Sequence, residues 1–479
     1  MLVRSEKNSF APINRIPPEI LSLLLDYYDE KVTDRSLITL THVCRRWRDI
    51  FTSRSSLWTQ LRFTNIDKTR AYIQRSQSSP LELYLNEESI DEAFNPVISH
   101  LHRLISLTIH AYDPQNVLGH FRNHAPLLEK LEINSTRDWV LDATLFNGDL
   151  SSLRKLRLAG VITYFPWKRL ANLQVVNLKA KRHSYRTSQI LDFFESAPLL
   201  HTISLQYPMP DSSDAPPDRI ATLRHLKVLT INPPPPQSAF LLRHLRIPSG
   251  ASLVSEFFFD GEESPLLDFL PERSPNLKNL SHITSVKLWF DLQLKYIQLS
   301  GPSGSLRVLV EWGHFWEPSY ARDCKILCSL SRQMPPTVQR LTVSMYEHSG
   351  PVEAEENPIF QMLSSMSNLR TLTLIDCNYL PFMVALDPEQ HSPDLVLCPN
   401  MEELIIYAHE WSLFEVNHLI AMAEGRASGG AKLSSIIFVD LGSCGQREEM
   451  FRLREHVAYV EYRIEDKPPT WDDPPGESE

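Results

Sequence analysis

The phrase LISLTI at residues 104–109 returns as LEKLEI at 128–133 and as LRKLRL at 153–158. Each copy carries apolar residues at its first, fourth and sixth positions. Because successive side chains of a strand point to opposite faces, the last two apolar positions predict a strand that buries one stripe. Related phrases begin at Leu81, Leu173, Leu200, Leu226, Ile283, Val338, Leu369, Met401, Leu433 and Val457.

The copies recur at near-constant distances along the chain. The central apolar residue returns every 20 to 27 residues between Leu83 and Leu229, and every 31 or 32 residues between Leu341 and Ile436. Two degenerate copies, at 257–259 and 308–310, bring the expected number of repeats to about fifteen. Such a period indicates supersecondary units that bury a core only against their neighbours.

Helices and proline junctions separate the strand phrases. SQILDFFESAP at 188–198 is an example of a helical stretch, and the junctions read APLL at 125–128 and 197–200, SPNL at 274–277 and CPNM at 398–401. Proline there ends a helix and favours extended geometry before it. The sequence over 80–465 therefore predicts an α/β fold and resembles an irregular leucine-rich-repeat solenoid, or horseshoe. It lacks the asparagine that usually follows the strand phrase, and unrelated amphipathic strands in separate α/β domains are the alternative.

Residues 13–63 carry no repeat phrase and predict helices. Pro17 and Pro18 suit the start of a helix, where a missing N–H costs little. Behind them Ile20, Leu21, Leu24 and Leu25 stand at helical spacing. A second apolar pattern runs through SLITLTHVCRRWRDIF at 36–51, and a short third element contains Leu57 and Trp58.

Three elements in this order resemble the F-box: Ile-Pro-Pro-Glu-Ile at 16–20, Val-Cys-Arg-Arg-Trp at 43–47 and Leu-Trp at 57–58. The resemblance implies a three-helix module that docks onto a Skp-type adaptor and, through it, onto a cullin. It implies adaptor contacts by Ile16, Pro17, Ile20, Leu21, Leu24, Val43, Cys44 and Trp47. With the SPLELYL segment that follows, the arrangement is similar to the large F-box families of mushroom-forming fungi.

Composition narrows the classes of partner. There are 58 Asp plus Glu against 48 Lys plus Arg, a net charge of −10, which disfavours nucleic acid or an anionic membrane as the main partner. We expect no secretory signal, because MLVRSEKNSF at 1–10 has no apolar core behind its positive charge, and no apolar stretch is long enough to span a membrane. Six scattered cysteines favour a reducing compartment, so we expect a cytoplasmic or nuclear location. Residues 1–12 are expected to be a flexible N-terminus, and 466–479 an acidic, Pro-rich tail.

Catalytic motifs are missing from the sequence. There is no phosphate-binding loop, no nucleophile elbow and no H-E-x-x-H, and Cys324 with Cys328 has no second ligand pair at metal spacing. We therefore expect a non-enzymatic protein with no cofactor and no metal. The F-box resemblance implies the substrate-recognition subunit of a Skp–cullin–F-box ubiquitin ligase. The alternative is a repeat scaffold that acts outside any ligase.

The residues that alternate with the buried stripe form the second face of each strand. This face is polar in the first repeats and becomes apolar further along, at Trp289, Ile375, Ile405, Tyr407 and Ile437. An apolar and aromatic patch of this kind predicts a site for an unknown protein substrate. A loop or the C-terminal tail that covers the patch is the alternative, and a one-residue slip in register would exchange the two faces.

Overall fold

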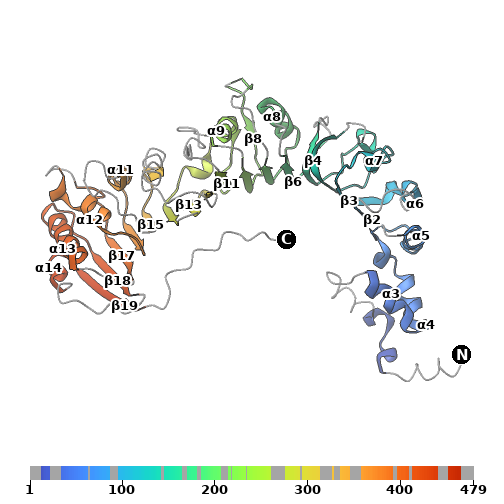
Figure 1. Ribbon diagram of the computed structural model, residues 1–479, viewed down its shortest axis with the longest axis horizontal. Helices are drawn as coiled ribbons and strands as arrows, with labels where there is room; N and C mark the ends of the chain where they lie inside the picture. Colours follow the sequence, from blue (N-terminus) through green and yellow to red (C-terminus); the bar gives the residue numbers. More distant parts are fainter. Residues whose placement is uncertain are drawn as a thin grey trace. The chain divides into compact units, whose positions relative to one another are not determined.

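The computed structural model describes residues 12–21, 34–62, 65–86, 95–141, 145–163, 170–180, 185–206, 214–216, 218–232, 235–259, 276–291, 294–312, 326–327, 335–345, 358–391, 396–408, 413–440 and 451–464. The chain divides into two compact bodies. Figure 1 labels helices and strands of both. The N-terminal body comprises residues 1–183 with 196–199, and the C-terminal body comprises 184–195 with 200–479. Each is described by itself below.

The N-terminal body begins with helices and continues as a parallel sheet. Its helices are η1 (Pro12–Arg15), α3 (Asp34–Val43), α4 (Arg45–Ser53), η3 (Ser55–Trp58), α5 (Ile66–Arg75), α6 (Asn95–Ile98), η5 (Leu101–Arg103), α7 (Gln115–Leu118) and η6 (Leu145–Gly148). Its strands are β1 (Gln60–Arg62), β2 (Leu81–Asn86), β3 (Leu104–Ala111), β4 (Lys130–Leu141), β5 (Lys155–Thr163) and β6 (Val175–Lys179). Each strand pairs in parallel with the next in chain order.

The C-terminal body has the same kind of construction. Its helices are α8 (Thr187–Ser196), α9 (Pro235–Arg243), η8 (Lys278–Leu280), α11 (Pro358–Ser364), α12 (Leu380–Leu386), η10 (Pro388–Gln390), α13 (Leu413–Ser428) and α14 (Leu453–His456). Its strands are β7 (Thr202–Gln206), β8 (Ala221–Thr222), β9 (Val228–Ile231), β10 (Leu245–Arg246), β11 (Ser252–Phe259), β12 (Ser285–Phe290), β13 (Leu294–Gly301), β14 (Gly304–Trp312), β15 (Arg340–Met345), β16 (Thr371–Ile375), β17 (Glu403–Ala408), β18 (Ser435–Asp440) and β19 (Tyr459–Ile464).

The strand phrases form strands in the predicted register. The inward positions are buried in both bodies, for example Leu131 and Ile133 on β4 and Leu404 and Ile406 on β17. Partners on neighbouring strands stand directly beside one another, as Leu372 of β16 does beside Leu404. The core is therefore shared between strands, and the mixed α/β class and the N-terminal helical module agree with the sequence.

The proline junctions form turns immediately before the strands. In APLL the amide of Leu128 donates to the carbonyl of Ala125, and in CPNM the amide of Met401 donates to that of Cys398, both at 3.0 Å. Pro126 and Pro399 thus occupy the second position of a four-residue turn, where the fixed φ of proline is favoured.

One part of the C-terminal body departs from the predicted succession of strand–helix repeats. β12, β13 and β14 form an antiparallel meander, and β13 matches no repeat phrase. β14 pairs in parallel with β11, whereas β12 pairs in parallel with β15. The order of strands is therefore reversed across the meander, and the expectation of one uninterrupted series of strand–helix repeats is wrong here.

Tight turns make this meander possible. β13 and β14 are joined by the two residues Pro302 and Ser303, and Gly304 has a φ of 135°. A Cβ atom on Gly304 would lie 2.5 Å from the carbonyl oxygen of Ala251, and one on Gly301 would collide with the carbonyl oxygen of His282. Backbone from neighbouring elements therefore occupies the space that a side chain would need.

Replacing Gly304 with alanine should destabilise the protein by about 3 kcal/mol, because it adds both a strained φ and a backbone collision. Gly250→Ala is the matched control: Gly250 has a φ of 87°, but beyond its chain neighbours no atom lies within 4 Å of the place that a Cβ would take. It should cost only about 1 kcal/mol. Urea unfolding midpoints of the full chain test this, and equal shifts for the two variants would contradict it.

Candidate functional site

The N-terminal helical module has a small core of its own. Leu21 and Phe51 are buried, and Ile16, Leu40, Trp47, Ile50 and Leu57 pack against them. The ring of Trp47 meets Phe51 edge-on at 5.6 Å between centroids. Of the residues expected to contact an adaptor, Ile16, Leu21 and Trp47 therefore contribute to the interior of the module. These three residues stabilise the module itself.

Asn14 joins the segment before the first helix to the start of α4. Its side-chain oxygen accepts a hydrogen bond from Trp47 Nε1 at 2.9 Å and lies 3.9 Å from the Sγ of Cys44. In addition, Arg46 Nη2 donates to the carbonyl of Ile16 at 2.7 Å. These contacts bring residues 14–16 beside 44–47. Asn14 is not predictable from the sequence pattern, because a single polar residue outside the apolar periodicity gives no signal.

Other predicted adaptor residues lie on the surface of the module. Pro17, Ile20 and Val43 are exposed, with 48% of Ile20 and 52% of Val43 accessible, and Cys44 is half-buried. Ile13, which was not among the predicted residues, is 47% exposed. Leu24 lies outside the described residues. Exposed aliphatic side chains on a small helical module are what contact with an adaptor would require.

Comparison with known families agrees with this geometry. Residues 13–64 match the family model described as F-box-like. These residues form an F-box-like domain. No curated protein matches the chain. Within the described residues, no helix is long and apolar enough to cross a membrane, and no group of His, Cys, Asp and Glu is placed to hold a metal ion.

The F-box-like domain is continuous with the sheet of the N-terminal body. Trp58 is fully buried, donates from Nε1 to the carbonyl of Phe51 at 2.8 Å, and meets Tyr72 of α5 edge-on at 4.9 Å. The guanidinium of Arg75 lies 4.2 Å from the centroid of the Trp58 ring. β1, two residues further on, pairs with β2. The sheet thus starts inside the predicted 13–63 module, before the predicted start of the repeat domain at residue 80.

The outward face of the N-terminal body is polar. Strand register places Tyr84, Thr108, Glu132, Arg157 and Asn177 in one row across five strands. Glu132 is the centre of a small network, because its carboxylate lies 3.5 Å from Lys130 Nζ and 3.7 Å from Arg157 Nη1. This face is therefore polar and carries charged pairs, as the sequence predicts.

The outward face of the C-terminal body divides the five predicted substrate residues into two groups. Trp289, Ile405 and Tyr407 are half-buried, whereas Ile375 and Ile437 are buried. Ile375 stands directly beside Tyr407, and Ile437 stands directly beside Ile405. Since side chains at paired positions share a face, these neighbours shield the two buried isoleucines. Ile375 and Ile437 are therefore not available as a surface in this structure.

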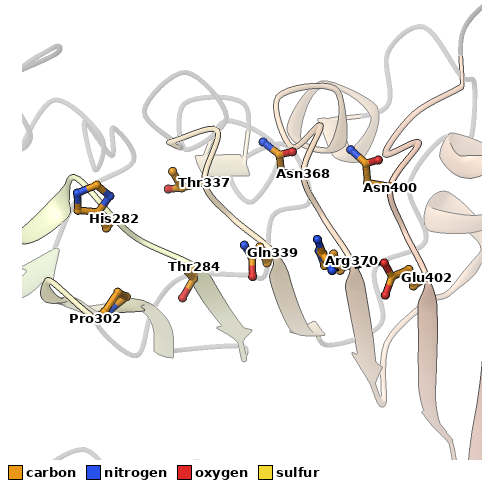
Figure 2. A pocket seen from close by; sticks show the side chains of 9 residues that line it. All are labelled: His282, Thr284, Pro302, Thr337, Gln339, Asn368, Arg370, Asn400 and Glu402. Atoms are coloured by element: carbon orange, nitrogen blue, oxygen red, sulfur yellow. Dashed lines mark hydrogen bonds and ion pairs between the residues drawn. The ribbon is translucent and has the colours of Figure 1, made fainter.

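A groove of about 620 Å³ lies where the strands of the C-terminal body begin (Figure 2). It is lined by His282, Thr284, Pro302, Thr337, Gln339, Asn368, Arg370, Asn400 and Glu402. Several of these side chains hold one repeat to the preceding one. Thr337 Oγ1 donates to the carbonyl of Ile283 at 2.6 Å, and Asn368 and Asn400 donate in the same way to Pro336 and Ser367, at 2.8 and 3.0 Å.

The groove is thus lined in part by polar side chains that precede β15, β16 and β17 and bond to the preceding turn. In the N-terminal body Asn172 makes the equivalent bond to the carbonyl of Ser151 at 2.7 Å. Regular leucine-rich repeats carry their asparagine after the strand phrase. In this chain, by contrast, the polar residues that make comparable hydrogen bonds stand before the strand phrase. Arg370 also pairs with Glu402 at 3.5 Å. The polar residues that line the groove therefore have a structural role, and their presence does not by itself indicate a ligand.

Two of the described cysteines are buried and one is not. Burial raises the pKa of the Cys398 thiol to about 12 and raises that of Cys377 as well, because removal from water disfavours the charged thiolate. Neither thiol therefore has the character of a nucleophile. Cys44, on the F-box-like domain, is half-buried.

A maleimide at pH 7.5 should label Cys44 about a hundredfold faster than Cys377 or Cys398, because labelling requires an accessible thiolate. Site-resolved mass spectrometry of the native chain measures the three rates. A urea-unfolded sample is the control, in which the three should react alike. Equal rates in the native chain would contradict the burial described above.

Proposed function

We propose that this chain is the substrate-recognition subunit of a Skp–cullin–F-box ubiquitin ligase. The observation that carries the proposal is the F-box-like domain at residues 13–64, with aliphatic side chains exposed on its surface. In this proposal the chain binds a Skp-type adaptor through that domain, reaches a cullin through the adaptor, and performs no chemistry itself. We place it in the cytoplasm, the nucleus or both.

The proposal assigns the remainder of the chain to substrate capture by an irregular leucine-rich-repeat domain. Two features support the assignment: the parallel, in-register strands and the polar side chains that bond each repeat to the preceding one. The affiliation with the F-box families of mushroom-forming fungi is part of the proposal and rests on the sequence resemblance.

Replacing both Ile20 and Val43 with aspartate should abolish co-purification of the adaptor. In the complex, the adaptor would bury these two side chains. Replacing such aliphatic anchors with charges typically weakens an interface by at least about 2 kcal/mol, or roughly thirtyfold in Kd. Leu127→Asp is the matched control, because Leu127 is 48% exposed, as Ile20 is, but lies outside the F-box-like domain. It should bind the adaptor normally.

Quantitative mass spectrometry of affinity-purified full-length chains provides the readout, with circular dichroism to show that each variant is folded. Adaptor binding by the folded double variant would overturn the proposal. Recovery of the adaptor without any cullin would instead favour a repeat scaffold that acts outside a ligase.

The half-buried outward residues of the C-terminal body are the proposed substrate surface. Trp289, Ile405 and Tyr407 are the accessible members of the predicted set, and their replacement with serine should remove substrate partners from a proximity-labelling profile. Thr108→Asp with Asn177→Asp, on the polar outward face of the N-terminal body, should leave that profile unchanged. If the serine variant keeps both its partners and its unfolding temperature, the surface is not the substrate site. If the fold is lost, the three side chains belong to the core.

A further inference from the structure

The short helix η1, at the start of the F-box-like domain, contains no buried residue. Two hydrogen bonds connect it to the rest of the domain. Asn14 Oδ1 accepts from Trp47 Nε1 at 2.9 Å, and directly after η1 the carbonyl of Ile16 accepts from Arg46 Nη2 at 2.7 Å. Both donors belong to the first turn of α4. The position of η1 therefore depends on polar contacts with the start of that helix.

These contacts keep two exposed aliphatic side chains on neighbouring segments. Ile13 directly precedes Asn14, and Val43 directly precedes Cys44, whose Sγ lies 3.9 Å from Asn14 Oδ1. Ile13 is 47% accessible and Val43 is 52% accessible. Each is thus one residue away from the contact that joins the two segments.

The corner between α3 and α4 is itself held in place. Cys44, between the two helices, has an extended backbone with φ −157° and ψ 172°. Arg48 Nε of α4 donates to the carbonyl of Thr41 in α3 at 3.0 Å, which closes the corner. Because α3 ends at Val43, the same helix α4 positions both Val43 and η1.

Trp47 gives a physical reason for a polar residue at position 14. An indole N–H is a donor only, and a half-buried donor without an acceptor is costly. The Trp47 ring also meets the buried Phe51 edge-on, at 5.6 Å between centroids. Asn14 therefore connects the exposed start of the domain to its small core.

We infer that Ile13 is a further adaptor-binding residue, and that Asn14 is the positioning residue that holds it close to Val43. The inference rests on the proposed function, because it extends the adaptor surface of the same domain, and the F-box-like match begins at residue 13. A surface that is already ordered loses less conformational freedom when its partner binds. Loss of the Asn14 hydrogen bond should therefore weaken adaptor binding even though Asn14 itself makes no adaptor contact.

Titration calorimetry of the full-length chain with a purified Skp-type adaptor provides the first test. Ile13→Asp should weaken the Kd about tenfold or more, since it places a charge in an interface that takes an aliphatic side chain. Because Ile13 is exposed, the variant should keep the unfolding temperature of the original chain.

A second set of variants tests the role of Asn14. Asn14→Leu is similar in size but cannot accept a hydrogen bond, and it should weaken the Kd about fivefold. Asn14→Asp keeps an oxygen acceptor for Trp47 and should bind within about twofold of the original. In an Ile13→Ala background, Asn14→Leu should change the Kd by less than about twofold, because its effect is exerted through Ile13.

Asn172→Leu is the matched control for a lost asparagine hydrogen bond. Asn172 donates to the carbonyl of Ser151 at 2.7 Å, in the same body but outside the F-box-like domain. This variant should lower the unfolding temperature and leave the adaptor Kd unchanged.

The outcomes separate this inference from the proposed function. If the original chain binds the adaptor and Ile13→Asp binds equally well, the inference is wrong and the proposed function stands. The positioning role of Asn14 is wrong if Asn14→Asp binds as weakly as Asn14→Leu, or if the loss persists in full in the Ile13→Ala background. A full-length chain that does not bind the adaptor would overturn both proposals. Should Asn14→Leu unfold the domain, Ile13→Asp still decides the assignment of Ile13, and Asn14→Asp decides that of Asn14.

Discussion

Every strand of these sheets depends on standing in register with its neighbours. In the C-terminal body the carbonyl of Gln339 accepts from the amides of Arg370 and Thr371, and that of Arg370 accepts from Glu402 and Glu403. In each case one carbonyl accepts hydrogen bonds from two successive amides, and this pattern fixes where the next strand begins. It places inward residues such as Leu372 and Leu404 side by side, where each completes the burial of the other. A single repeat could not bury its own stripe.

This dependence explains which features the sequence could predict. Inward positions repeat with the strand phrase, so their burial follows from a local pattern, and the F-box-like elements have a fixed order and spacing. The meander could not be read in the same way, because β13 has no phrase and its turn depends on Gly301 and Gly304 avoiding distant backbone. The burial of Ile375 and Ile437 likewise depends on side chains that arrive from neighbouring strands. Asn14 acts through residues some thirty positions away.

Within the N-terminal body, the F-box-like domain packs directly against the first strands of the sheet. Trp58 belongs to the third element of the F-box resemblance, yet it packs between Phe51 of the domain and Tyr72 of α5, immediately before β1. Ser79 Oγ donates to Ser55 Oγ at 2.7 Å across the same junction. A residue that identifies the family thus also fixes the domain to the first strands. An adaptor bound to this domain would be held at a set orientation to those strands, without a flexible linker between them.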